Sequence, residues 1–293
     1  MILSDLKYLA TSHNQAVIIN VGTRQVTTLA LLSALRHAQM PVLLIDCESN
    51  DGSWDYFTRL MEDRPFDMLS APLRQHGETL DWLFQNINCD NLLLIDSDLE
   101  ILNGDIVRWM ARLIEQSHVF GAGFTHGPCW LHDNPGVGYY QERMWMPITL
   151  LKTVCVRQAL EKGHSFSAMV RNNDFFPSRL VSNRLAKRFN NPRTRSLRLS
   201  WLDAFKTSYY GQKPCYLFYD TGASVFQHLK YQMGLHFAGF PAEVQMDDVT
   251  HFHGVTRAVL NPDDPIATSM AEISDTIRNR LRNEYGFDAE RWQ

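Results

Sequence analysis

The stretch NLLLIDSDLEIL (91–102) carries an apolar run directly into two aspartates. The four aliphatic residues 92–95 lead into Asp96-Ser97-Asp98. Side chains alternate between the two faces of a strand, so a continuous apolar run predicts a strand that is buried on both faces. By the same alternation Asp96 and Asp98 point the same way where the strand leaves the core. A divalent cation would offset their repulsion, because hard cations take carboxylate oxygens. The alternatives are two solvated turn residues, or an aspartate that caps the next helix.

Similar apolar runs alternate with helical patterns through the first 125 residues. The patterns predict strands at 16–22, 41–47, 66–72, 91–96 and 118–124, and helices at 27–38, 77–87 and 105–116. Such alternation predicts a parallel sheet with helices on both faces. Ligands of such sheets bind beyond the carboxyl ends of the strands. Polar clusters fall at three of these ends, namely Thr23-Arg24, residues 46–53 and residues 96–98.

The pattern changes after residue 125. We expect an irregular loop at 127–147, a strand at 146–156, a helix at 223–234, a strand at 248–254 and a C-terminal helix at 267–286. The predicted fold class is therefore α/β, with one domain built on a mostly parallel, mixed central sheet that helices flank. A C-terminal helical appendage follows this domain.

The composition excludes several classes of protein. The 293 residues are 45% hydrophobic and carry a net charge of −4, so no global charge points to nucleic acid. The five cysteines form no C-x-x-C pair, which favours reduced thiols in a cytoplasmic protein. No apolar run approaches the roughly 18 residues that span a bilayer.

Residues 171–200 are rich in arginine. A solvated helical face and an anionic surface are both open interpretations of this segment. The anionic surface would be an acceptor or the inner face of a membrane, which the C-terminal helix is the other candidate to contact.

Three motifs together resemble the family-2-like glycosyltransferases of the GT-A fold. The segment DCESNDGS (46–53) resembles the D-D-G-S-T-D-G-S element of that family, from which Cys47 and Glu48 depart. The hydrophobic-D-x-D run at 92–98 matches the family's metal-binding signature. HFHGVTR (251–257) is similar to the H-x-x-G element that supplies a further metal ligand.

The resemblance covers residues 14–125 well and residues 215–257 loosely. It implies a GT-A-like domain at 1–262, with a nucleotide-binding half at 14–125, an acceptor-binding half at 126–262 and a helical tail at 263–293. The implied activity is metal-dependent transfer of a hexose from a nucleoside-diphosphate sugar, with UDP favoured, to the hydroxyl of a glycan or a lipid-linked acceptor. Inversion at the sugar is favoured, and synthesis of a bacterial-type polysaccharide or glycoconjugate is the expected setting.

The resemblance also assigns candidate roles to single residues. Asp98 and His251 would bind Mn²⁺ or Mg²⁺ directly, and Asp96 would hold the ribose, a metal-bound water or the metal itself. The expected nucleotide-binding residues are Thr23, Arg24, Asp46, Ser49, Asp51, Asp96, Ser97 and Arg257. Carboxylates with one imidazole suit Mn²⁺ well.

Asp220 is the first candidate for the catalytic base, because an inverting transfer needs a base within reach of the attacking hydroxyl. The alternative for Asp220 is a plain N-cap of the following helix. Asp203 and Glu142 are weaker candidates for the base.

Two other functions remain open. The D-x-D also resembles the signature of haloacid-dehalogenase-like phosphatases, in which Asp96 would be the nucleophile, Asp98 the acid and Asp247-Asp248 the late acidic pair. A non-catalytic module that binds a nucleotide sugar is the other alternative.

Overall fold

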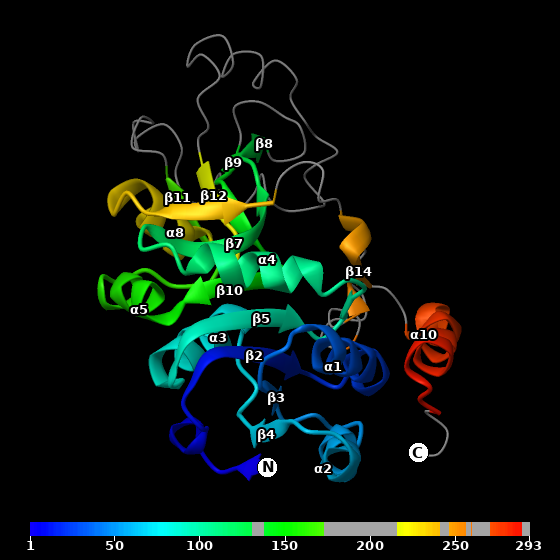
Figure 1. Ribbon diagram of the computed structural model, residues 1–293. Coiled ribbons are helices and arrows are strands. Elements are labelled where there is room, and N and C mark those ends of the chain that lie inside the picture. Colours follow the sequence, from blue (N-terminus) through cyan, green and yellow to red (C-terminus); the bar gives the residue numbers. More distant parts are fainter. Residues whose placement is uncertain (131–137, 173–215, 241–245, 256–258, 260–269, 289–293) are drawn as a thin grey trace, which may run out of the picture.

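The computed structural model describes residues 1–130, 138–172, 216–240, 246–255, 259 and 270–288. An eight-stranded sheet forms its centre, in the order β1-β4-β3-β2-β5-β10-β7-β13 (Figure 1). The strands are β1 (Ile2–Leu3), β2 (Ser12–Asn20), β3 (Val42–Asp46), β4 (Asp67–Ser70), β5 (Cys89–Asp96), β7 (Val119–His126), β10 (Arg143–Lys152) and β13 (His236–Gly239).

The sheet is mixed and mostly parallel. The pairs from β1 to β5 are parallel, β10 runs antiparallel to both β5 and β7, and β13 is parallel to β7. The predicted fold class is therefore confirmed.

Helices cover both faces of the sheet (Figure 1). One face packs against α1 (Arg24–His37), α2 (Ser53–Asp63), α4 (Asp105–Ile114) and α10 (Met270–Tyr285). The other packs against α3 (His76–Asn86), α5 (Thr153–Glu161) and α8 (Ala223–Gln227), which continues as a π-helix at His228–Gln232. Short 3₁₀ helices lie at Leu6–Tyr8 and Met246–Asp248.

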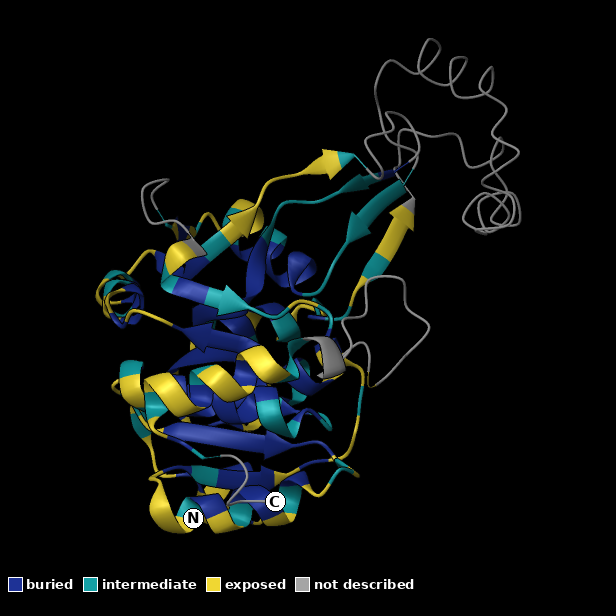
Figure 2. Ribbon diagram, turned by 90° about the vertical axis from the view of Figure 1, so that its right-hand side faces the viewer, coloured by how far each residue is buried: buried dark blue, intermediate teal, exposed yellow. Residues whose placement is uncertain are grey.

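The run in β5 explains why both faces need helices. Leu93 and Ile95 belong to the core on the α1 side, whereas Leu92 and Leu94 belong to the core on the α3 side. Figure 2 shows these central strands as buried. Asp96 has the same parity as Leu92 and Leu94, so its side chain leaves the strand toward the α3 side.

Two smaller sheets complete the described chain. β6 (Leu99–Ile101) pairs with β14 (Val249–His251). A four-stranded sheet, in the order β11-β12-β9-β8, extends away from the body of the molecule (Figure 2). Its strands are β8 (Cys129–Trp130), β9 (Gly138–Tyr140), β11 (Met169–Asn172) and β12 (Tyr216–Tyr219).

Two sequence predictions were wrong in part. The expected loop at 127–147 contains β8, β9 and the start of β10. The expected strand at 146–156 ends at Lys152, where pairing with β5 stops, and helix α5 follows. The β-branched residues Thr153, Val154 and Val156 favour a strand locally, but burial of Val156 and Ala159 against the α3 side stabilises a helix.

The expected C-terminal helix is confirmed as α10, whose Ile277 and Leu281 are fully buried. The proposed boundary at 262/263 lies outside the described residues, as does the basic stretch from 173 onward. Among the helices of the described residues, none combines the length and the apolar character needed to cross a membrane.

Gly222 marks the point where α8 begins against β10. Its φ is +79°, and a Cβ there would lie 2.8 Å from Met144 Cε and 2.9 Å from Met146 Sδ. Gly234 has a similar φ of +67° but no atom within 4 Å of the Cβ position. Of these two glycines, Gly222 therefore combines a positive φ with a close approach, and Gly234 does not.

We expect Gly222→Ala to lower the free energy of unfolding by about 2–3 kcal/mol, because the strained φ adds to a shift that the ends of the Met144 and Met146 side chains must make. Gly234→Ala is the matched control and should cost only the backbone part, about 1 kcal/mol. Urea denaturation followed by circular dichroism measures both values. Equal losses in the two variants would contradict the close contact of Gly222 with Met144 and Met146.

Candidate metal centre and adjoining pocket

The Asp96-Ser97-Asp98 segment turns the chain from β5 into β6. In the β6–β14 ribbon, Leu99 lies opposite His251. The ribbon continues for one further bond, in which the Phe252 N–H donates to the Asp98 carbonyl at 2.8 Å. This pairing brings His251 beside Asp98, although 153 positions separate them in the chain.

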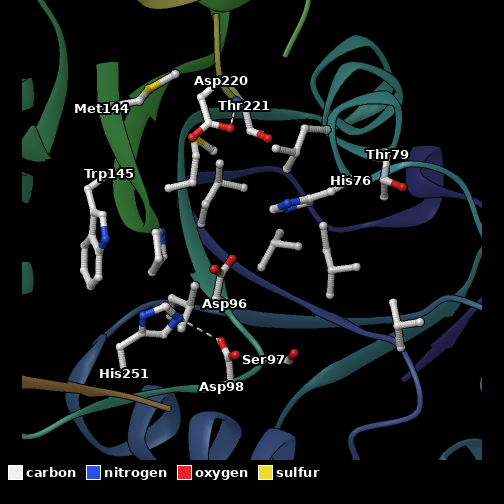
Figure 3. Close-up of a pocket in the computed structure, with 18 of the residues that line it drawn as sticks. His76, Thr79, Asp96, Ser97, Asp98, Met144, Trp145, Asp220, Thr221 and His251 are labelled. Carbon is white, nitrogen blue, oxygen red and sulfur yellow. Dashed lines mark hydrogen bonds and ion pairs between the residues drawn. The ribbon is translucent and has the colours of Figure 1, made fainter. Parts of the chain in front are cut away.

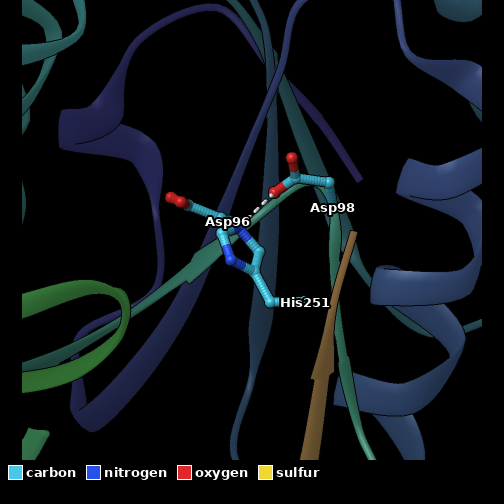
Figure 4. Close-up of side chains that lie close together, drawn as sticks. All are labelled: Asp96, Asp98 and His251. Carbon is cyan, nitrogen blue, oxygen red and sulfur yellow. Dashed lines mark hydrogen bonds and ion pairs between the residues drawn. The ribbon is translucent and has the colours of Figure 1, made fainter. Parts of the chain in front are cut away.

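Asp96, Asp98 and His251 form one cluster (Figure 4). Their ligand atoms all lie within 4.8 Å of one another, and His251 Nε2 is 3.1 Å from Asp98 Oδ1. Metal–oxygen distances of about 2.0–2.6 Å allow two ligands of one cation to lie up to about 5 Å apart. The cluster therefore has the dimensions of a divalent-cation site.

The electrostatics of the cluster favour a cation. Burial raises the pKa of Asp96, the charge of Asp98 acts in the same direction, and His76 and His251 oppose the rise. The Nδ1 atom of His251 is buried and has no hydrogen-bond partner among the described residues. Two carboxylates and one imidazole fit Mn²⁺ or Mg²⁺ by donor type, and a bound cation would favour the ionised carboxylates.

The cluster opens into a pocket of about 540 Å³ (Figure 3). The pocket lies beyond the carboxyl ends of β2, β3 and β5, on the α3 side of the sheet. Its polar lining comprises Arg74, His76, Thr79, Asp96, Ser97, Asp98, His126, Arg143, Asp220, Thr221, His251 and His253. Its apolar lining includes Val17, Ile19, Leu94, Met144, Trp145 and Met146.

Asp220 lies at the other end of the pocket, and Asp96 lies between Asp220 and Asp98 in the view of Figure 3. Its Oδ2 is 3.2 Å from Arg143 Nε, and its Oδ1 accepts the Thr221 N–H at 2.9 Å. Gly222 is the N-cap of α8, and no side chain caps this helix. Asp220 is thus a pocket residue and not the plain N-cap that was its alternative.

Glu142, one of the two weaker candidates for the base, is already paired within the protein. Glu142 Oε1 is 2.6 Å from Lys230 Nζ, and its Oε2 accepts a hydrogen bond from the Tyr231 hydroxyl. Burial acts to raise the pKa of Glu142, but the bonds from Lys230 and Tyr231 outweigh it and lower the pKa. Glu142 does not line the pocket. Asp203 lies outside the described residues.

Asp46 is bound within the protein. Only 2% of it is exposed, and its Oδ1 accepts hydrogen bonds from Asn20 Nδ2 at 2.7 Å and from Ser49 Oγ at 2.6 Å. Ser49 also accepts the Gly22 N–H at 2.8 Å. Asp46 and Ser49 therefore hold two neighbouring strand ends together, and neither lines the pocket.

Some of the other expected nucleotide-binding residues line the pocket, and others do not. Ser97 and Asp96 line the pocket, whereas Thr23, Arg24 and Asp51 do not. Thr23 is buried and bonds to Asn20 and Thr27, and the Asp51 carboxylate accepts the Arg24 N–H at 3.3 Å. The Arg24 guanidinium lies over the Tyr56 ring. Arg257 lies outside the described residues. Contact of these residues with a nucleotide stays a prediction.

The sequence interpretation missed two cationic walls of the pocket. Arg74 lies between β4 and α3, His76 is the first residue of α3, and Arg143 begins β10. Arg74 Nη1 and Arg143 Nη1 are buried without a hydrogen-bond partner among the described residues. The polar LRQH stretch at 73–76, at a predicted strand end, was an available signal for the first wall. Arg143 fell in the expected loop and gave no such signal.

The comparisons with known proteins concern the fold. No protein-family model matches the chain, and no curated protein matches its sequence. A mannosyltransferase, PcManGT from Pyrobaculum calidifontis in complex with GDP-Man and Mn²⁺, is similar in structure, with 12% identity and a TM-score of 0.39. The match covers 55% of this chain and 48% of that one.

TarS from S. aureus in complex with UDP-GlcNAc matches with 14% identity and a TM-score of 0.37, over 50% of this chain and 47% of that one. The 4-diphosphocytidyl-2C-methyl-D-erythritol synthase of Anaerococcus prevotii matches with 9% identity and a TM-score of 0.38, over 76% and 96%. The chain thus spans about half the length of the first two proteins. At these TM-scores the matches carry no argument about this chain.

We expect the wild-type protein to bind Mn²⁺, and Asp98→Asn to weaken this binding by about 100-fold or more. Loss of an outer partner of a metal ligand already costs about 10–100-fold, and loss of a ligand should cost at least as much. His251→Gln should behave in the same way. The electron paramagnetic resonance signal of free Mn²⁺ measures the affinity.

His253→Gln is the matched control. The His253 ring lies 4.0 Å from the His251 ring, also lines the pocket, and is not part of the carboxylate cluster. It should leave the Mn²⁺ affinity within about threefold. An equal loss in His253→Gln would show that the assignment of His251 as the ligand is wrong.

Proposed function

We propose that the chain is a metal-dependent glycosyltransferase that moves a sugar from a nucleoside-diphosphate sugar to an acceptor hydroxyl. The cluster of Asp96, Asp98 and His251 at the carboxyl edge of the sheet is the observation that carries the proposal. It opens into a pocket of small-molecule size that holds another carboxylate, Asp220, at its far end. A proposed cation site and a candidate base in one cavity support the proposal.

The proposed reaction breaks the bond between the anomeric carbon and a diphosphate oxygen, and negative charge develops on that oxygen. A bound Mn²⁺ or Mg²⁺, held by Asp98 and His251 with Asp96, would supply the neutralising charge. The unpartnered N–H groups of Arg74 and Arg143 provide further donors for an anionic substrate. Ser97, also in the pocket lining, is proposed to contact the nucleotide.

Asp220 is the proposed base, and it would accept the proton of the acceptor hydroxyl as that oxygen attacks. Arg143 orients its carboxylate from one side, and the Thr221 N–H orients it from the other. Attack from the side opposite the leaving diphosphate would invert the sugar carbon. UDP as the nucleotide, a hexose as the sugar, a glycan or lipid-linked acceptor, and a cytoplasmic setting remain predictions.

The phosphatase interpretation is less well supported. Its late acidic pair, Asp247-Asp248, does not line the pocket. Asp248 Oδ1 instead accepts a hydrogen bond from Asn103 Nδ2 at 3.1 Å, where the β6–β14 ribbon ends. A non-catalytic binding module would not need a carboxylate that is oriented in the pocket, as Asp220 is.

We expect release of nucleoside diphosphate when the protein is incubated with Mn²⁺ and a panel of UDP-, GDP- and dTDP-sugars. Asp220→Asn should lower this rate by about 100-fold or more, because general base catalysis contributes about 10²–10⁴-fold. Glu142→Gln, the control at a carboxylate outside the pocket, should stay within about threefold. Coupled detection of the released nucleotide measures both rates.

The outcomes separate the candidate functions. Release of phosphate from p-nitrophenyl phosphate, without release of nucleotide, would favour the phosphatase. Metal-dependent nucleotide binding with no release from any donor would favour the binding module. Near-normal turnover of Asp220→Asn would remove Asp220 from the role of base.

A further inference from the structure

We propose that helix α10 positions the metal ligands, through a contact of Arg280 and Tyr285 with Glu100 in β6. The inference rests on the proposed metal site. It concerns residues that lie outside the pocket lining and would touch neither the metal nor a substrate. Arg280 and Tyr285 are therefore proposed as positioning residues.

The β6–β14 ribbon is the element that sets the spacing of Asp98 and His251. Asp98 immediately precedes β6, and His251 is the last residue of β14. In the register of the ribbon, Glu100 lies opposite Thr250, one position from the Leu99–His251 pair. A shift of β6 against β14 would therefore move one ligand relative to the other.

Glu100 is a buried charge in the middle of this ribbon. Its side chain is 1% exposed. Arg280 donates to both carboxylate oxygens, with Nη2 2.9 Å from Oε1, and the Tyr285 hydroxyl donates to Oε1 at 2.9 Å. These donors come from α10, which lies 180 positions along the chain. The buried carboxylate is therefore satisfied by the C-terminal helix.

Helix α10 is itself anchored to the domain (Figure 1). Ile277 and Leu281 are fully buried in the core on the α1 side. Ser274 Oγ donates to Gln25 Oε1 at 3.1 Å, and Arg36 of α1 donates to the Glu284 carbonyl at 2.9 Å. Helix α1 also contacts β6, because the Ser33 hydroxyl accepts the Ile101 N–H at 3.1 Å.

This arrangement couples the docking of α10 to the geometry of the cation site. Removal of one partner from a buried ion pair leaves an uncompensated buried charge, which β6 can relieve only by moving toward water. Such a movement would change the spacing of Asp98 and His251. Coupling between two sites is reciprocal, so a cation at the cluster should in turn stabilise docked α10.

The first experiment measures Mn²⁺ affinity in Arg280→Met. Mutation of a residue that orients a metal ligand typically costs about 10–100-fold in affinity, so we expect a loss of at least tenfold. Arg278→Met is the matched control on the same helix, since among the described residues Arg278 pairs with the exposed Asp275 and not with Glu100. It should leave the affinity within about twofold. Tyr285→Phe is the second variant if Arg280→Met does not fold, because it keeps the ring and removes only the hydroxyl. We expect it to lower the Mn²⁺ affinity by about threefold or more.

The second experiment measures amide hydrogen exchange in α10. If the role of Arg280 were purely structural, bound metal would not change this exchange. Mn²⁺ should slow exchange across residues 273–285 of the wild-type protein and have no such effect in Asp98→Asn. Circular dichroism should show that each variant is folded.

Each outcome decides the inference. Folded Arg280→Met with the affinity of Arg278→Met, or wild-type α10 whose exchange ignores bound Mn²⁺, would overturn it and leave the proposed function intact. If Tyr285→Phe replaces Arg280→Met, unchanged affinity in that variant would overturn it in the same way. A wild-type protein that binds no Mn²⁺ would overturn the inference together with the proposed function.

Discussion

Repulsion between two carboxylates at the end of one buried strand is the constraint on which the site depends. Asp96 and Asp98 follow a continuous apolar run, and their ligand atoms lie within 4.8 Å of each other and of a ring nitrogen of His251. Such a cluster is unfavourable for two ionised groups unless positive charge lies nearby. Burial raises the pKa of Asp96, whereas the nearby His76 and His251 act to lower it. The proposed divalent cation would offset the repulsion most directly.

Residues from distant parts of the sequence hold this cluster in place. Strand β5 carries Asp96, and the β6–β14 ribbon brings His251 to Asp98. Helix α10 donates hydrogen bonds to the buried Glu100 carboxylate of β6. Arg143, at the start of β10, and Asp220, just before α8, lie at the other end of the same pocket. The proposed cation site and the candidate base thus line one pocket, although Asp96, Asp220 and His251 lie far apart in the chain.

The sequence predicted the central sheet and the clustering of Asp96, Asp98 and His251 because both leave local signals. An apolar run followed by D-x-D marks Asp96 and Asp98, and H-x-x-G marks His251. The sequence did not predict that Asp46 and Ser49 would satisfy Asn20, because that network needs β2 and β3 to be neighbours with a known register. Arg74 and Arg143 were missed because pocket walls are made by loops and strand ends that meet only in the folded chain. Helix α2 was not among the predicted elements, although Trp54, Phe57 and Leu60 recur at intervals of three residues, which is close to a helical period.

A crystal structure of the protein with Mn²⁺ and UDP, recorded at the manganese absorption edge, tests the central claim most directly. We predict an anomalous peak within about 2.0–2.6 Å of an Asp98 oxygen, with a nitrogen of His251 and diphosphate oxygens completing the coordination. An anomalous peak more than about 3 Å from every Asp98 oxygen, or a diphosphate bound away from the cluster, would contradict the assignment.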